Sequence, residues 1–344
     1  MKASIDGVPS ARRRRRLLLV LASTVVALMV LGLAAGSDGL SWHALRGDLA
    51  GDQAMLILGR IRAPRTVGAL LVGALLGLAG ALAQGLFRNP LADPFLLGSA
   101  AGASLGVVLV LAVGAFGGHL IGSGAAAWLE RIGMVAAAFC GALFGVALTL
   151  LLARGAQQTV RLLLAGVVVG VLLGAVGDLA TLVSPDALRG RQAFVLGTTG
   201  LLGWPSVACL GAALAIALPI AVGLGSVLDA LTIGDDSAAS LGLSLSRLRL
   251  ALVLLFALAT GVAVSQSGLI AFVGLVSPHL VRRAAPGPHG YLLAASALAG
   301  GALLLAADVV ARVVMAPREL PVGIVTALVG GAYLLWLLQR RSGT

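Results

Sequence analysis

The chain has 344 residues, of which 59% are hydrophobic, 11% are charged and 48 are glycine. A soluble domain carries about 25% charged residues, so this composition excludes an ordinary soluble protein and indicates a polytopic helical membrane protein. The formal net charge is +11, yet only 4% of residues are aromatic. Nucleic-acid binding needs aromatic platforms or a basic face, so we interpret the surplus charge as a determinant of membrane topology.

The N-terminus combines a basic segment over 1–16, containing Arg12 to Arg16, with an apolar run over 17–36. A cleaved secretory signal is the alternative interpretation, but its apolar region has only about 7–15 residues. The run here is longer and further apolar runs follow it. We therefore expect a retained first helix with a cytoplasmic N-terminus.

Apolar runs between charged or Pro/Gly-marked breaks predict ten membrane-spanning helices. The expected ranges are 17–36, 65–86, 94–115, 132–153, 160–183, 205–226, 248–267, 269–286, 291–310 and 321–339. The fold class is thus all-α, with one ten-helix transmembrane domain over 17–340 and a tail at 341–344. Most of the lysines and arginines fall in the predicted cytoplasmic segments, so both termini are expected in the cytoplasm.

The connections between these runs differ in character. We expect the external segment 37–64 to lie along the membrane surface, and the external stretch 184–204 to hold a short helix, because Pro185 and Gly190 interrupt it. Two cysteines, Cys140 and Cys209, fall inside apolar runs. We interpret both as small buried residues without a redox role.

Catalytic chemistry is not expected. The sequence contains no GxxxxGK[ST] phosphate loop and no HExxH motif, and its four histidines lack metal-ligand spacing. The chain is therefore expected to bind no metal or cofactor and not to be an enzyme. An ion-gradient-driven transporter would need buried acids within its spans; only Asp178 and Asp308 are candidates, and both lie near span ends.

Five short polar motifs stand at the ends of the apolar runs, in a fixed order. They contain Arg62, Pro64 and Arg65; Gln84, Asn89, Pro90, Leu91, Ala92, Asp93 and Pro94; Phe272, Gly274, Leu275, Pro278, His279 and Arg282; Asp308, Ala311 and Arg312; and Glu319, Leu320, Pro321 and Gly323. This ordered set closely resembles the FecCD-type permease family of bacterial ABC importers for iron–siderophores, haem and vitamin B12. The resemblance covers about 60–340.

The resemblance implies a permease in the bacterial inner membrane that works as a homodimer with one central pathway. It implies two separate ATPase subunits, which bind ATP–Mg, and a periplasmic substrate-binding protein. The substrate would be a metal chelate: an iron–siderophore, haem or a corrinoid such as vitamin B12. The motifs do not distinguish among these substrates.

The internal segment 227–247 is the only sizeable cytoplasmic loop in the predicted topology. A permease without a nucleotide site must receive conformational work through a contact, and this loop is the available one. The resemblance points to the same segment as the family's ATPase-coupling region. The coupling residues expected here are Gly234, Asp235, Ala238, Leu241 and Gly242.

Several predicted external arginines need an explanation other than topology. The resemblance implies that Arg62, Arg65 and Arg312 dock carboxylates of the binding protein, a task that suits the planar guanidinium. Interfacial anchoring at headgroup level is the alternative. For Arg312, an ion pair with Asp308 four residues earlier competes with docking.

The proline motifs are expected to have backbone roles. Asn89–Pro90 and Asp93–Pro94 disfavour helix in the residues before each proline, so they should turn the chain between the second and third helices. Pro278–His279 should break or kink a helix. We interpret His279 as structural rather than as a metal or haem ligand.

Overall fold

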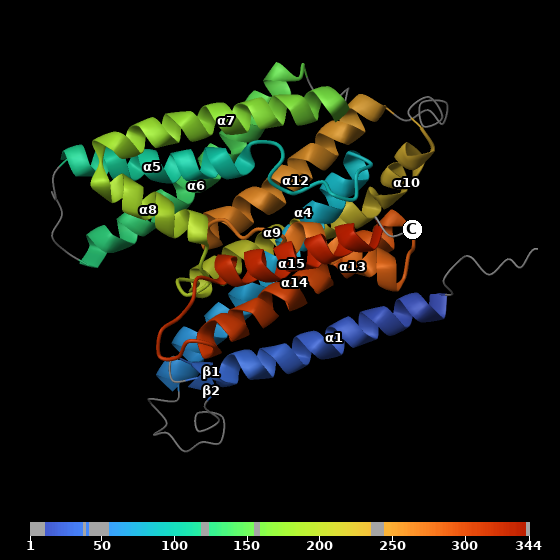
Figure 1. Cartoon of the computed structure of the whole chain (residues 1–344), viewed down its shortest axis with the longest axis horizontal. Coiled ribbons are helices and arrows are strands. Elements are labelled where there is room, and N and C mark those ends of the chain that lie inside the picture. Colours follow the sequence, from blue (N-terminus) through green and yellow to red (C-terminus); the bar gives the residue numbers. More distant parts are fainter. Residues whose placement is uncertain are drawn as a thin grey trace, which may run out of the picture.

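A computed structural model describes residues 11–36, 39–40, 55–117, 124–154, 159–234 and 244–341. These residues are nearly all helical, and most of the long helices run side by side along the longest axis of the molecule (Figure 1). The elements in chain order are α1 (Ala11–Ala34), β1 (Ala35–Gly36), β2 (Gly39–Leu40), η1 (Met55–Arg62), α4 (Ala63–Leu86), α5 (Ser99–Gly117), α6 (Gly124–Leu152), α7 (Thr159–Val183), α8 (Pro185–Leu196), α9 (Trp204–Gly223), α10 (Gly225–Ile233), α12 (Leu245–Ser267), α13 (Val273–Ala284), α14 (His289–Val313) and α15 (Val322–Arg341).

Every predicted span overlaps a helix. Within the described residues, seven helices are long and apolar enough to cross a membrane: α1, α4 with η1, α6, α7, α9, α12 and α14. Two more, in α5 and α15, are apolar but shorter over their described side chains. The all-α polytopic fold is therefore confirmed.

The predicted span 269–286 is wrong as a full helical span. Helix α13 has only 12 residues, and the chain before it is irregular, with positive φ angles of 71° at Gly268 and 69° at Phe272. The backbone finds partners within the protein, since Leu269 N donates to Phe194 O at 2.9 Å. Irregular backbone is tolerated at membrane depth where protein surrounds it, and an apolar sequence does not reveal this.

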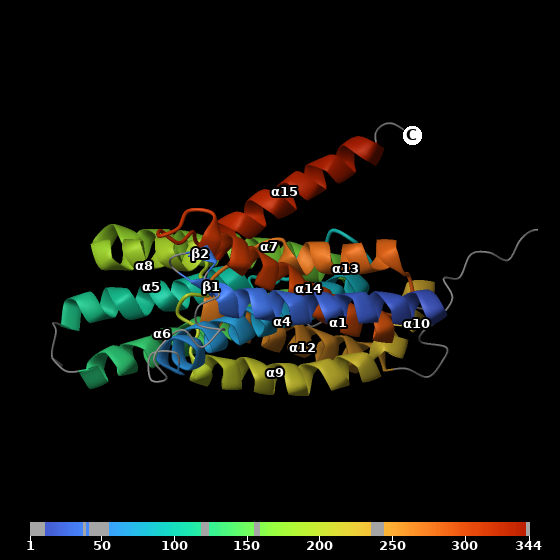
Figure 2. The ribbon, with the colours of Figure 1, turned by 90° about the horizontal axis from the view of Figure 1, so that it is seen from below.

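Helices α4 and α14 form the centre of the bundle, and glycines set their separation. A Cβ atom on Gly73 would lie 2.3 Å from Gly300 O, and one on Gly77 would lie 2.2 Å from Ser296 O. Helix association in lipid depends on such close backbone approach. Of the most apolar 18-residue stretch in η1 and α4, 83% is buried. The corresponding share in α1, which lies on the outside of the bundle, is 17% (Figure 2).

The two cysteines correct one sequence interpretation. Cys140 in α6 and Cys209 in α9 are both exposed rather than buried. Their helices present apolar outer faces to the surroundings of the bundle. Inside a membrane an apolar run fits a lipid-facing position as well as a core position, so the sequence alone does not separate the two.

Two of the predicted external connections, 184–204 and 37–64, contain helical structure. The predicted short helix in 184–204 is confirmed as α8, whose first turn is capped by Ser184 Oγ, which accepts a hydrogen bond from Ala187 N at 3.2 Å. Of the expected surface segment 37–64, residues 55–62 instead form η1, which runs directly into α4. Most of the remaining segment lies outside the described residues.

The two ends of the bundle are distinct in Figure 1. The start of α1, helix α10 and the C-terminus lie toward one end, while β1, β2 and α8 lie toward the other. With the positive-inside assignment, the first is the cytoplasmic end and the second the external end. The arginines Arg12 to Arg16 form the exposed first turns of α1.

Candidate functional site

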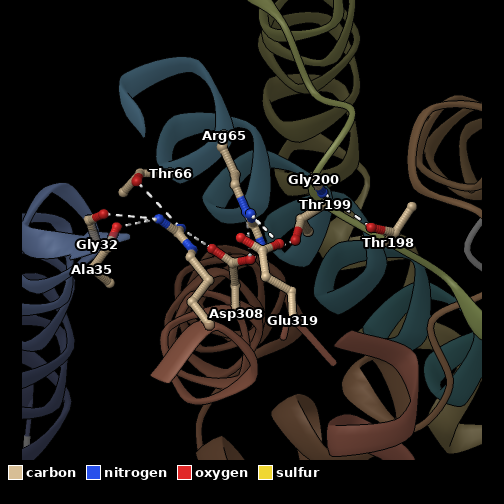
Figure 3. Close-up of polar contacts among 10 residues, drawn as sticks. Gly32, Ala35, Arg65, Thr66, Thr198, Thr199, Gly200, Asp308 and Glu319 are labelled. Atoms are coloured by element: carbon tan, nitrogen blue, oxygen red, sulfur yellow. Dashed lines mark hydrogen bonds and ion pairs between the residues drawn. The ribbon is translucent and has the colours of Figure 1, made fainter. Parts of the chain in front are cut away.

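At the external end, four charged side chains from distant parts of the sequence meet beside the end of α1. We call Arg65, Asp308, Arg312 and Glu319 the external charge cluster. The carboxylate of Asp308 is completely buried at its centre. Its Oδ1 atom accepts a hydrogen bond from Arg65 Nε at 3.1 Å and another from Thr199 Oγ1 (Figure 3). Its Oδ2 atom accepts one from Arg312 Nη2.

Arg312 is the most deeply buried arginine of the cluster, with a side chain that is 1% exposed. Its Nη1 atom donates to Gly32 O at 2.9 Å and to Ala35 O at 3.3 Å. The last carbonyl groups of a helix lack partners within that helix and carry partial negative charge, so the guanidinium stabilises the end of α1. Arg312 thereby ties α1 to α14.

The docking role expected for Arg312 stays a prediction, but its contacts in this structure are internal. The i,i+4 ion pair with Asp308, which the sequence offered as the competing interpretation, is the contact that forms. Because the guanidinium points inward and is hydrogen-bonded to α1, it presents no surface to an external carboxylate in this structure.

Arg62 lies beside Arg312 in space and has a similar environment. Its Nη1 atom donates to Leu33 O at 3.0 Å and to Ala34 O at 3.2 Å. Two of the three predicted docking arginines therefore bind backbone carbonyls at the end of α1. Arg62 is only half-buried, so part of its side chain still faces outward.

Arg65 stands at the outer edge of the cluster. While its Nε atom faces Asp308, its Nη1 atom donates to Glu319 Oε2 at 2.7 Å. The Arg65 side chain is 10% exposed and that of Glu319 is 37% exposed. The partner of Arg65, Glu319, thus faces the external solution.

The charges of the cluster balance, because two guanidinium groups face two carboxylates. Burying an ion is costly unless it is paired and hydrogen-bonded, and the buried Asp308 meets both conditions. The sequence motifs contained all four charged residues, but they assigned no role to Glu319. The contribution of Thr199 had no sequence signal, because that residue stands outside every motif.

At the cytoplasmic end, the short helix α10 packs on the start of α14. Leu228 and Leu231 of α10 are buried, and a Cβ atom on Gly225 would lie 2.5 Å from Gly290 N. Asp229 Oδ1 accepts a hydrogen bond from the backbone N of His289 at 3.1 Å and lies 2.6 Å from His289 Nδ1. Asp229 thus caps the first turn of α14 from outside that helix.

The predicted coupling segment is only partly described. Gly234 ends α10 with φ 127°, a conformation that an L side chain adopts only with strain. The other predicted coupling residues, Asp235, Ala238, Leu241 and Gly242, lie outside the described residues. The ATPase-coupling role stays a prediction.

Helix α14 therefore connects two distant sites. His289 begins it at the cytoplasmic end, and Asp308 and Arg312 stand near its external end. At about 1.5 Å per residue its 25 residues span about 37 Å. Between the two sites it packs closely against α4, at Ser296 and Gly300.

The two proline motifs between α4 and α5 form the expected turns. Asn89 Oδ1 accepts from Leu91 N at 2.9 Å, and Asp93 Oδ1 accepts from Phe95 N at 2.8 Å. Both side chains thus replace backbone partners, as Asx turns do. Burial raises the pKa of the Asp93 carboxyl to about 6, opposed in part by the Phe95 hydrogen bond, which lowers it.

Of the two outcomes expected for the third proline motif, a break or a kink, the structure shows no break at Pro278. Helix α13 is continuous through Pro278, and the break lies earlier, at 268–272. The ring of His279 packs edge-on against the ring of Tyr333, with centroids 5.9 Å apart. Among the described residues no group of His, Cys, Asp and Glu side chains is arranged to hold a metal ion.

Both acids that an ion-gradient mechanism would use are paired. Asp178 forms an ion pair with Arg191 of α8 and is 64% exposed. Asp308 is shared between Arg65 and Arg312. These pairings do not favour a proton-carrying role for either residue.

Comparisons with known proteins agree with this description. Residues 20–340 match the FecCD transport family. The chain is 37% identical to the hemin transport system permease protein HmuU of Yersinia pestis, over 92% of this chain and 94% of that protein. It is 40% identical to the vitamin B12 import system permease protein BtuC of Serratia proteamaculans, over 92% and 90%. A solved inward-facing structure of a metal-chelate type ABC transporter aligns with a TM-score of 0.82 and 26% identity, covering 95% of this chain and 99% of that one.

Together the apolar helical bundle and these similarities define a multi-pass inner-membrane transport protein of the permease class. The chain belongs to the FecCD transport family.

Proposed function

We propose that this chain is the membrane-spanning permease subunit of a binding-protein-dependent ABC importer, and that ATP is hydrolysed by a separate subunit. The observation that carries the proposal is the family match over residues 20–340, with relatives at 37–40% identity that are permeases of hemin and vitamin B12 import systems. The alternative, an ion-gradient-driven transporter, has no support from the paired acids Asp178 and Asp308.

The cytoplasmic end is the proposed docking face for the ATPase. Residues 227–247 include the end of α10, which is fastened to α14 through Asp229 and His289. A force applied to α10 would be transmitted to α14, because the two helices share this hydrogen-bonded contact and a close backbone approach at Gly225. Helix α14 in turn carries Asp308 and Arg312 at the external end.

A homodimer with one pathway is the proposed assembly, with two ATPase subunits and one periplasmic binding protein. Large apolar side chains are exposed along α7, among them Val171, Leu179 and Leu182. Such a surface is stable against lipid or against a second copy of the chain. Closed two-fold symmetry is the commonest arrangement for identical subunits.

The proposed substrate is a metal chelate of the iron–siderophore, haem or corrinoid class. The support is the description of the relatives as hemin and vitamin B12 permeases and of the structural neighbour as a metal-chelate type transporter. The chain itself would then bind no cofactor, and ATP–Mg would bind the partner ATPase.

The subunit composition of the purified complex tests this proposal without any knowledge of the substrate. The permease and its ATPase, co-expressed and purified in detergent, should form a complex whose native mass corresponds to two copies of each. Proteolytic protection or cross-linking should map the ATPase to residues 227–247. A complex with one permease copy per two ATPases, or a permease that never retains an ATPase, would contradict the proposal.

A further inference from the structure

The ion pair of Arg65 and Glu319 joins a buried side chain to a partly exposed one. Arg65 belongs to the rigid start of α4, and its Nε atom is fixed by the buried Asp308. Glu319 belongs to the exposed connection between α14 and α15, where residues 314–319 all face solvent. Its carboxylate reaches Arg65 Nη1 at 2.7 Å while its side chain stays 37% exposed.

The charge balance of the external charge cluster depends on this pair. Arg65, Asp308 and Arg312 alone carry a net charge of +1, and Glu319 brings the total to zero. If the Glu319 side chain turned outward, the Nη1 atom of Arg65 would lose its partner and a cationic position would face the external solution. A guanidinium in that state binds a carboxylate most readily, through charge-assisted hydrogen bonds.

We propose that Glu319 is an internal stand-in for the carboxylate of an external protein, and that this partner displaces it from Arg65 when it docks. The proposal rests on the proposed function, since the partner is the acidic surface of the periplasmic binding protein. The external end of the bundle also presents the exposed arginines Arg60 and Arg318, so the surrounding charge favours an acidic partner.

The exchange explains how a buried cluster serves both stability and docking. In the free permease, Glu319 neutralises the cluster and keeps Arg65 oriented. In the docked state, a partner carboxylate takes over both tasks, and Glu319 is released into solvent, where a carboxylate is well hydrated. Asp308 and Arg312 need not move, because only the outermost pair is exchanged.

Two variants separate this exchange from a general effect of charge. Glu319→Gln removes the competing charge at Arg65. Asp186→Asn is the matched control, because Asp186 is an exposed acid at the same end, paired with Arg189 at 3.4 Å and remote in sequence from the cluster. Each variant removes one negative charge from the external end.

The first measurement is the affinity of the binding protein for the reconstituted permease–ATPase complex in nanodiscs. We expect Glu319→Gln to lower Kd by about fivefold, the gain from losing one competing ion pair, and Asp186→Asn to change it by less than about twofold. Equal effects of the two variants would mean that binding responds to the net charge of the external end and not to an exchange at Arg65, which would overturn the proposal. Unchanged or weaker binding by Glu319→Gln would overturn it as well.

The second measurement needs no binding protein, so it separates failure of this inference from failure of the proposed function. Acetate serves as the carboxylate probe. Sodium acetate, compared with sodium chloride at equal ionic strength, should raise the thermal midpoint of the Glu319→Gln permease but not that of the wild type or of Asp186→Asn. Absence of an acetate effect on Glu319→Gln shows that Arg65 accepts no external carboxylate once the competing charge is removed, and overturns the proposal, whatever the transport assays give.

Discussion

Asp229 of α10 caps α14 from outside that helix: its Oδ1 atom accepts the backbone N–H of His289 at 3.1 Å and lies 2.6 Å from the His289 ring nitrogen Nδ1. A helix N-terminus has unsatisfied N–H groups and favours a negative charge. One carboxylate therefore joins the short cytoplasmic helix to the helix that carries Asp308 and Arg312 at its other end.

This contact predicts a coupling defect. Asp229→Ala removes the cap at a cost of about 0.5–2 kcal/mol and frees α10 from α14. In proteoliposomes, the variant should hydrolyse ATP but import fewer substrate molecules per ATP than the wild type. Asp229→Asn keeps an acceptor oxygen and should retain most of the coupling. Equal transport per ATP in Asp229→Ala and the wild type would show that this contact transmits nothing.

The external charge cluster predicts a large loss of stability from a small change. Asp308→Asn leaves Arg65 and Arg312 buried without their shared counter-charge, and breaking a buried pair in this way costs about 3–5 kcal/mol. The thermal midpoint in detergent should fall sharply. The exposed pair of Asp186 and Arg189 supplies the control, since Asp186→Asn should cost less than about 1 kcal/mol. Similar small losses for both variants would mean that the cluster contributes little to stability.

Because α4 and α14 pack so closely, we expect a single methyl group added between them to destabilise the protein. In Gly73→Ala the new Cβ atom would lie 2.3 Å from Gly300 O, so the helices must separate, at a cost of about 1–3 kcal/mol. A Cβ atom on Gly133 in α6 would meet no neighbouring group within 4 Å. Gly133→Ala should be neutral or stabilising by up to about 1 kcal/mol. Thermal unfolding of the two purified variants distinguishes the cases, and equal midpoints would contradict the assigned packing.

Asp93 predicts a pH dependence of stability. It lies in the turn between α4 and α5, outside the spanning helices, and its pKa is raised from 3.8 to about 6 by burial. Between these values the folded state holds a proton that the unfolded state has released, so this group makes the protein less stable as pH rises from about 4 to about 6. The loss then persists at neutral pH.

The substitution Asp93→Asn isolates that contribution. Asparagine keeps the oxygen that accepts from Phe95 N but cannot ionise. Its thermal midpoint should exceed that of the wild type at pH 7.5, and the difference should vanish near pH 4. Asp93→Ala also removes the charge but loses the turn, so it should be less stable than Asp93→Asn. A difference between wild type and Asp93→Asn that does not change with pH would rule out a raised pKa.

The sequence of this protein predicts its long helices well but not its irregular buried segment or its lipid-facing residues. Apolar runs located the long helices because a bilayer requires a minimum length of apolar helix. They failed over 269–286, because a buried extended segment and a helix can share the same apolar composition. They also failed for Cys140, since lipid and protein interior are equally apolar.

The site was predictable in its charged members but not in its geometry. The motifs contained Arg65, Asp308, Arg312 and Glu319, yet the sequence left Arg312 with two competing interpretations, docking of a binding protein and an ion pair with Asp308. Only the fold shows that α1 ends beside it and supplies carbonyl acceptors. Thr199 had no signal at all, because its role arises from where the α8–α9 connection passes.

We propose that this chain imports its substrate with energy from a partner ATPase. The most direct measurement is uptake of labelled haem, iron–siderophore and vitamin B12 into proteoliposomes containing the permease and its ATPase, with the binding protein outside and ATP inside. We expect one of these chelates to accumulate only when ATP, the ATPase and the binding protein are all present. Uptake that persists without the ATPase and follows an imposed ion gradient would contradict it.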